Sequence, residues 1–179
     1  MKKLYFVNGF LEAGKTTFVK ELLSQDYFDT GEKTLVLLCE DGSEEYTDDF
    51  CREHHLTVEM IEDEDAFTDE KLREVEEKIN PERIIIEFNG MWNPEHKLDY
   101  WSGEQIMMIV IIDASTFELY LNNMKPYVKQ QITNAYMTVF RSCDGKENRL
   151  ASYRRSIRAL NPQTNFVFKN KDCLLYTSP

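Results

Sequence analysis

The chain has 179 residues and a mass of 21.2 kDa, a length that suits one domain with a substantial core. Its 32 acidic residues outnumber 21 basic ones and give a net charge of −11, which argues against general DNA or RNA binding because phosphate backbones attract positive charge. The longest apolar run, residues 106–112, is well short of the roughly 18 residues that cross a bilayer, and the N-terminus lacks the features of a signal peptide. These features predict a cytoplasmic protein that binds neither nucleic acid nor membrane.

Short apolar runs alternate with helical patterns along the chain. In chain order we expect a strand at 4–7, a turn at 9–14, a helix at 15–24, a strand at 34–38, a helix at 44–54, a strand at 56–61, an acidic loop at 62–65, a helix at 68–79, strands at 83–87 and 106–112, helices at 115–121 and 126–133, a strand at 137–140, a helix at 148–160 and a last strand at 166–168.

The expected strands are apolar on both faces and are separated by helices. This pattern predicts a three-layer, doubly wound α/β fold with a mainly parallel sheet, of the P-loop NTPase kind. Residues 1–170 are expected to form one nucleotide-binding domain. Residues 171–179 continue no motif, and we expect them to be a tail, either truncated or foreign to the native chain.

A glycine-bounded segment follows the first expected strand and is named the phosphate loop. Residues 9–17 read Gly-Phe-Leu-Glu-Ala-Gly-Lys-Thr-Thr. Glycines let the backbone bend around phosphate groups with its amides pointing inward, and the helix that follows adds its positive N-terminal end. We expect Lys15 to reach the β- and γ-phosphates and the Thr16 hydroxyl to ligate Mg²⁺. The residues expected to contact the nucleotide here are Gly9, Glu12, Ala13, Gly14, Lys15, Thr16 and Thr17.

One residue of the phosphate loop stands out. Glu12 places a carboxylate inside a segment that should receive anions. We expect it either to point outward or to weaken nucleotide binding by repulsion.

Acidic groups follow two of the expected strands. Glu40 comes just after residues 34–38, and Glu87 ends residues 83–87. In open α/β sheets ligands bind beyond the carboxyl ends of the strands, so both carboxylates are expected to face the phosphates. We predict Thr16, Glu40 and Glu87 as the magnesium ligands, and Lys15 and Glu87 as the catalytic residues. Gly90 is expected to offer its backbone N–H to the γ-phosphate and to act as a hinge.

These motifs resemble those of the CobW-like GTPases, whose phosphate loop usually reads Gly-Phe-Leu-Gly-Ala-Gly-Lys-Thr-Thr. The Glu-Asp-Gly at 40–42 is similar to that family's Asn-Glu-x-Gly segment, and the Glu-Phe-Asn-Gly at 87–90 is similar to its Glu-x-x-Gly segment. Residues 109–117 and 158–162 also resemble family segments, so the resemblance spans almost the whole chain.

The resemblance implies a GTPase that binds GTP or GDP with Mg²⁺, of the class that includes metal-insertion and metal-trafficking proteins. It implies a coupling of nucleotide binding to a protein partner, to formation of a homodimer, or to metal delivery. Hydrolysis is expected to be slow without a partner, because the sequence shows no arginine finger.

Three family features are altered in this chain. The family's Cys-x-Cys-Cys motif is reduced to Cys51, with His54 and His55 nearby, and three ligands so close on one short helix should not converge. The guanine-reading Asn-Lys-x-Asp is replaced by Arg-Ser-Cys-Asp, in which Asp144 remains to accept hydrogen bonds from guanine and Arg141 could stack on the base. Family members commonly carry a C-terminal domain after the nucleotide-binding domain, and this sequence ends at Pro179.

Two other functions stay open on the sequence. The first is a nucleotide-binding switch that does not hydrolyse, which Glu12 and the altered guanine motif favour. The second is an ATP-dependent small-molecule kinase, although no arginine-rich lid segment is present.

Overall fold

The computed structural model describes residues 2–170 and the backbone of residues 174–178. The strands are β1 (Lys3–Asn8), β2 (Thr34–Leu38), β3 (Leu56–Met60), β4 (Arg83–Glu87), β5 (Ile106–Asp113), β6 (Met137–Arg141), β7 (Asn165–Lys169) and β8 (Leu174–Ser178). The α-helices are α1 (Lys15–Leu23), α2 (Asp48–Glu53), α3 (Asp69–Ile79), α4 (Phe117–Asn123), α5 (Lys125–Ile132) and α6 (Leu150–Leu160).

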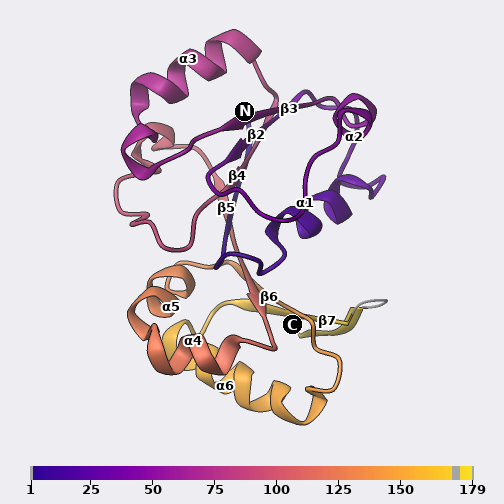
Figure 1. Ribbon diagram of the computed structural model, residues 1–179, viewed down its shortest axis with the longest axis vertical. Coiled ribbons are helices and arrows are strands. Elements are labelled where there is room, and N and C mark those ends of the chain that lie inside the picture. The colour runs from indigo at the N-terminus through magenta and orange to yellow at the C-terminus, as the bar shows by residue number, and fades with distance from the viewer. Residues whose placement is uncertain (1, 171–173, 179) are drawn as a thin grey trace.

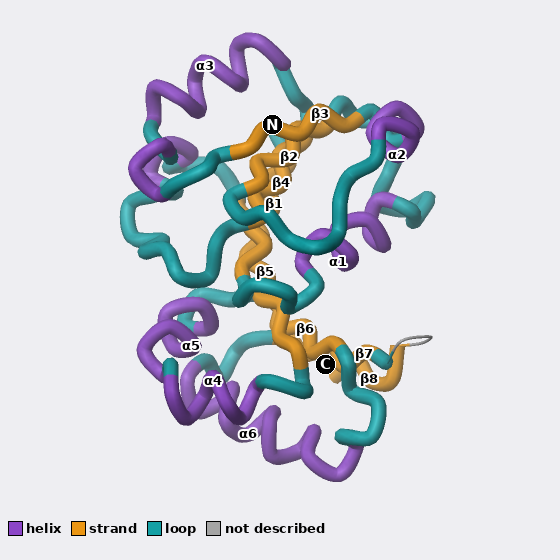
Figure 2. Tube along the Cα trace, viewed as in Figure 1, coloured by secondary structure: helices purple, strands orange, loops and turns teal. Residues whose placement is uncertain are grey.

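The strands form one sheet in the order β3-β2-β4-β1-β5-β6-β7-β8, which runs through the middle of the molecule (Figure 2). The first seven are parallel, and β8 is antiparallel to β7. β1 lies at the centre, between β4 on one side and β5 on the other. The strand order reverses direction there, so a crevice is expected at the carboxyl end of β1, where ligands of such sheets bind.

Helices cover both faces of the sheet, as Figure 1 shows. On one face α3 packs over β1, β2 and β4 through Leu72 and Val75, and α4, α5 and α6 pack over β5, β6 and β7. On the other face α1 packs through Phe18, Val19 and Leu23. The three-layer, doubly wound, mainly parallel fold predicted from the sequence is therefore confirmed.

Most helix and strand ends lie within two residues of the expected ones, and three differences from the expected elements need a physical reason. α2 begins only at Asp48, because the Thr47 side chain accepts a hydrogen bond from the Phe50 amide and caps the helix there. Residues expected to be an acidic loop include a 3₁₀ turn at Glu64–Ala66, capped by Asp63. β7 is not the last strand, because β8 pairs with it within the region expected to be a tail.

The first residue of β4 is a buried cation. Arg83 is fully buried, and its guanidinium donates to the Phe28 carbonyl and to Glu32 Oε2, each at 2.5 Å. The guanidinium also lies over the Phe28 ring. A buried charge is tolerated only when it is paired and hydrogen-bonded, and Glu32 supplies the countercharge here.

None of the helices in the described part of the chain has the length and hydropathy that crossing a bilayer requires.

Candidate functional site

The phosphate loop leaves the carboxyl end of β1, at the centre of the sheet. Gly9 has φ 152°, and a Cβ added there would lie 2.4 Å from the Ile111 carbonyl oxygen on the neighbouring strand. Gly14 has φ 92° and precedes the first turn of α1. Both positions require glycine, so the loop can turn sharply against β5 and enter α1.

Lys15 is buried, and its ammonium group is directed back over the loop. Its Nζ donates to the carbonyl oxygens of Gly9 at 2.7 Å and Phe10 at 2.9 Å, and to Glu40 Oε2 at 2.5 Å. The side chain of Lys15 is only 6% exposed and that of Glu40 only 11%, so the ion pair is shielded from water. The structure thus brings together two residues that the sequence assigned to one site from separate segments.

Glu87, at the end of β4, faces the first turn of α1. Its Oε2 accepts a hydrogen bond from the Thr16 hydroxyl at 2.7 Å, and its Oε1 accepts one from the Tyr46 hydroxyl. Burial raises the pKa of the Glu87 carboxyl, which is only 1% exposed, although the two hydroxyls and nearby Lys15 oppose the shift. An ionised Glu87 is therefore short of countercharge in this conformation.

The donors around Glu87 fit a magnesium ion. A threonine hydroxyl and a carboxylate stand within hydrogen-bond distance of each other, and the Glu40 carboxylate lines the same cavity. Hard oxygen ligands of this kind are what Mg²⁺ prefers, and a divalent cation would supply the countercharge that Glu87 lacks. Thr16, Glu40 and Glu87 are the residues that could hold it.

A cavity of about 160 Å³ opens over these groups. It is lined by Leu11, Glu12, Gly14, Lys15, Thr16, Thr17, Glu40, Gly42, Ser43, Glu44 and Glu87. Of the predicted nucleotide contacts within the described residues, Gly9, Ala13, Gly90 and Asp144 lie outside this lining.

Glu12 points away from the loop axis and reaches a distant segment. Its backbone has φ 59°, and its carboxylate accepts hydrogen bonds from the Ser43 amide at 3.0 Å and the Ser43 hydroxyl at 2.6 Å. These two bonds lower the pKa of Glu12. The side chain thus points out of the phosphate loop, which is the first of the two outcomes expected, and it joins the loop to the segment after β2. The effect of Glu12 on nucleotide binding stays a prediction.

Gly90 lies against the phosphate loop from the other side. A Cβ at Gly90 would come within 2.5 Å of the Gly9 carbonyl oxygen and 2.6 Å of Gln131 Nε2. Gln131, from α5, donates to the Gly90 carbonyl at 3.0 Å. The contact fixes the segment after β4 on the loop.

Arg141 is the last residue of β6, and Asp144 follows it at the same edge of the sheet. The Arg141 side chain covers Gly14, where an added Cβ would lie 2.8 Å from Nε, and its guanidinium pairs with Glu21 of α1 at 2.8 and 3.2 Å. Lys169 pairs with the same carboxylate. Asp144 is exposed in the loop that follows. The expectation that Arg141 stacks on a base is untested, but Arg141 does border the phosphate loop.

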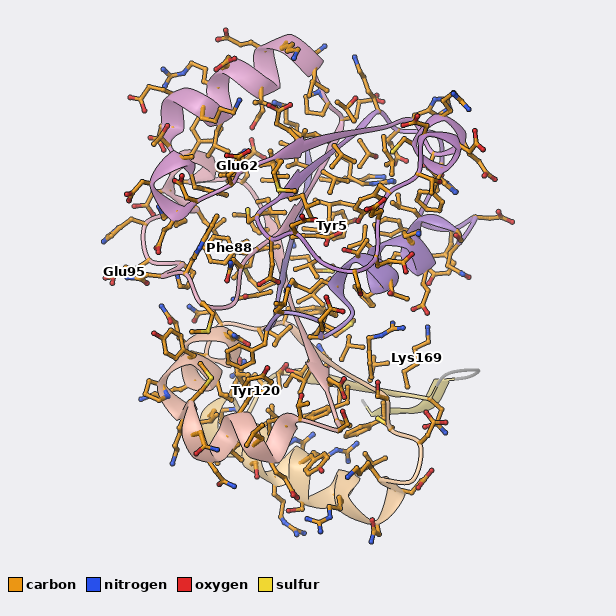
Figure 3. All side chains as sticks on the ribbon, viewed as in Figure 1. Tyr5, Glu62, Phe88, Glu95, Tyr120 and Lys169 are labelled. Atoms are coloured by element: carbon orange, nitrogen blue, oxygen red, sulfur yellow. The ribbon has the colours of Figure 1, made fainter. Side chains whose placement is uncertain are left out.

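A second cavity, of about 270 Å³, lies on the side of the phosphate loop toward α4 and α5. Its walls are mostly apolar and include Phe10. Tyr120 of α4, which Figure 3 labels, stacks on Phe10 with ring centroids 4.1 Å apart. No sequence motif indicated this cavity. Three polar residues of the site were also missed, namely Ser43, Tyr46 and Gln131, because no motif marks them and each reaches the site through a contact between segments far apart in the sequence.

His54, at the C-terminal end of α2, has a structural role. His54 Nδ1 lies 2.6 Å from Asp29 Oδ2, and the His54 ring packs on Phe50. Across the described residues, no three His, Cys, Asp or Glu side chains gather in a way that could hold a metal ion.

At the centre of the parallel sheet, a strand leads through a glycine-bounded loop to the N-terminus of a helix. A buried lysine and a threonine lie there, opposite a carboxylate at the end of another strand. Together these features define a P-loop nucleotide-binding protein. The chain belongs to the CobW/HypB/UreG family, whose nucleotide-binding domain matches residues 3–168.

Solved structures share the fold at low identity. The hydrogenase maturation factor HypB from Archaeoglobus fulgidus has a TM-score of 0.70 and 12% identity, over 94% of this chain and 81% of that chain. HypB from Helicobacter pylori in complex with nickel has a TM-score of 0.57 and 17% identity, over 93% and 79%. The Zn(II)-bound YjiA GTPase from E. coli has a TM-score of 0.59 and 20% identity, over 88% of this chain and 55% of that chain. Comparison with curated proteins gives no significant match.

The raised pKa of Glu87 leads to a stability prediction. Because the folded pKa lies above the unfolded one, the stability linked to this group is complete below the unfolded pKa of about 4.5 and is lost as pH rises through the folded pKa. We expect Glu87→Gln to raise the melting temperature of the ligand-free protein by roughly 3 °C at pH 7.5, and the gain to shrink toward pH 5.

Thermal unfolding in EDTA between pH 5 and 8 measures this effect. Glu45→Gln, an exposed neighbour, is the matched control and should leave the melting temperature unchanged. An unchanged or lower melting temperature for Glu87→Gln across the whole range would contradict the assignment of an uncompensated buried carboxyl.

Proposed function

We propose that the chain binds GTP and GDP with Mg²⁺ in the cytoplasm and hydrolyses GTP slowly. The observation that carries the proposal is the pairing of Thr16, at the start of α1, with the buried Glu87 at the end of β4, beside the Lys15 ammonium. This arrangement offers a cation, helix amides and oxygen ligands within one cavity, which are the parts that phosphoryl transfer needs.

Each predicted residue has a defined role in this proposal. Lys15 binds the β- and γ-phosphates, with the backbone of Gly9, Glu12, Ala13, Gly14, Thr16 and Thr17. Thr16, Glu40 and Glu87 hold Mg²⁺, which when bound neutralises phosphate charge. Glu87 also organises the attacking water. Gly90 contributes its amide, and Asp144 accepts hydrogen bonds from guanine.

The absence of a second cation at the phosphates supports slow turnover. Among the described residues, no arginine lines the cavity of the phosphate loop, and nearby Arg141 is held by Glu21. An arginine at the transferred phosphate accelerates such reactions by roughly 10³–10⁵-fold. We therefore propose that a protein partner, or a second copy of the chain, is needed for fast hydrolysis. A switch that does not hydrolyse is the alternative that this observation favours.

The relatives support a link to metal handling. YjiA binds zinc and one HypB binds nickel in their solved structures. The chain spans 55% of the YjiA chain, so any metal delivered or bound is a proposal for the whole protein.

Calorimetry with GDP, GTP and ATP, each with Mg²⁺, tests the nucleotide. We expect guanine nucleotides to bind at least about tenfold more tightly than ATP, a difference of about 1.4 kcal/mol. Phosphate release over many turnovers, with a catalytically dead control of Glu87→Gln, then separates a slow GTPase from a switch. Equal or better binding of ATP would refute the role of Asp144, and turnover equal to the control would favour the switch.

A further inference from the structure

Two contacts join the phosphate loop to residues 40–43, the segment that follows β2. Glu12 accepts hydrogen bonds from both the amide and the hydroxyl of Ser43, at 3.0 and 2.6 Å. Lys15 donates to Glu40 Oε2 at 2.5 Å. The contacts come from positions three residues apart on each segment, so they hold the two backbones side by side along one wall of the cavity.

All three N–H donors of the Lys15 ammonium are already used in this arrangement. An ammonium group has three donors, and the carbonyls of Gly9 and Phe10 and the carboxylate of Glu40 accept one bond each. A phosphate that binds Lys15 must take the place of one of these acceptors. Glu40 is the acceptor that can leave, because the two carbonyls belong to the loop itself.

The position of Glu12 allows it to affect how easily the Glu40 carboxylate leaves Lys15. Its left-handed backbone turns the side chain out of the loop, and Gly42 packs close to it, with an added Cβ only 3.7 Å from Glu12 Oε1. The hydrogen bonds from Ser43 lower the pKa of Glu12, so its carboxylate is ionised and the bonds are formed at neutral pH.

We propose that Glu12 is a positioning residue that holds Ser43 on the phosphate loop and thereby keeps Glu40 paired with Lys15. Nucleotide binding is then an exchange, in which a phosphate replaces the Glu40 carboxylate on Lys15. The Glu12 clamp is the pair of hydrogen bonds between Glu12 and Ser43. The proposal rests on the proposed nucleotide site. It assigns to the Glu12 side chain a contact with the protein and none with the nucleotide.

The clamp and simple charge repulsion make different predictions for two variants. Glu12→Gln removes the charge and weakens both bonds, whereas Ser43→Ala keeps the charge and removes the bond from the hydroxyl. Under the clamp both variants open residues 40–43, so both should speed the association of a fluorescent GDP analogue with Mg²⁺ by about threefold, the scale of an exposed charged contact. Repulsion alone predicts faster association for Glu12→Gln only.

Further variants sharpen the test. Ser43→Thr keeps the hydroxyl and should restore the wild-type association rate. The double variant Glu12→Gln/Ser43→Ala should be no faster than Glu12→Gln alone, because both changes break one contact. Glu45→Gln, an exposed acidic neighbour outside the clamp, is the control and should associate at the wild-type rate.

Hydrogen exchange of residues 40–44 without nucleotide gives an independent measurement. The Ser43 amide donates to Glu12, so its exchange should become several-fold faster in Glu12→Gln, while the exchange of β4 stays the same. Unchanged exchange, or unchanged association in Ser43→Ala while wild type binds the analogue, would overturn the clamp. Failure of the wild-type protein to bind any nucleotide would instead overturn the proposed function.

Discussion

Replacing Lys15 by alanine is expected to weaken the binding of GTP and GDP by at least about 100-fold. The side chain is the one cation buried against the phosphate loop in the described part of the chain, and its three donors are held by two carbonyls of the loop and by Glu40. One charge-assisted hydrogen bond to phosphate, at roughly 1.5–3 kcal/mol, together with the attraction between the shielded ammonium and the phosphate charge, accounts for a loss of this size. Calorimetry with Mg²⁺ measures it.

The matched control is Lys71→Ala. Lys71 also pairs with a carboxylate, Glu59, but it lies on α3, away from the phosphate loop. It should bind GDP as wild type does. Thermal unfolding of Lys15→Ala checks that the loss of the pair with Glu40 leaves the protein folded. A folded Lys15→Ala protein with wild-type affinity would exclude the phosphate loop as the nucleotide site.

Gly90→Ala is expected to destabilise the protein by about 1–3 kcal/mol and to lower nucleotide affinity at the same time. The added Cβ would lie 2.5 Å from the Gly9 carbonyl oxygen, which itself accepts a hydrogen bond from Lys15. The backbone of the phosphate loop must therefore move to admit one methyl group. Urea unfolding measures the stability, and calorimetry with GDP measures the affinity.

Gly42→Ala is the control that measures how replacing a glycine by alanine changes stability when no steric clash results. Its added Cβ meets no atom closer than 3.7 Å, and Gly42 also borders the cavity. We expect its unfolding free energy to stay within about 0.5 kcal/mol of wild type. Wild-type stability in Gly90→Ala would show that the segment after β4 does not rest on the phosphate loop in solution.

Local patterns were enough to predict the layers of the fold and the centre of the site. The signals that predicted them lie within a few neighbouring residues of the sequence. They are the apolar runs of β1, β4 and β5, the helical period of α3 and the glycine–lysine spacing of the phosphate loop. β8 was not predicted, because its strand conformation is set by pairing with β7 at the edge of the sheet. Such pairing is a long-range property with a weak local signal.

The contacts within the site were harder to predict than the residues. The sequence showed that Glu12 was out of place in a phosphate loop, but its partner Ser43 lies 31 positions away. Tyr46 was expected in a helix, and only the cap at Thr47 leaves it free to reach Glu87. The role of Asp144 and the reading of guanine stay predictions.

β4 carries one buried charge at each end, and the protein neutralises only one of them. Arg83 at the start is paired with Glu32, whereas Glu87 at the end receives, within the described part of the chain, only hydroxyl donors and the more distant charge of Lys15. Under the proposed function, the Mg²⁺ that binds with the nucleotide supplies the positive charge that Glu87 lacks. The ligand-free protein is therefore the less stable form, and ligand binding raises the fraction of folded molecules by mass action. Proteases and chaperones act on the unfolded fraction, so the lifetime of the chain in a cell would follow the supply of nucleotide and magnesium.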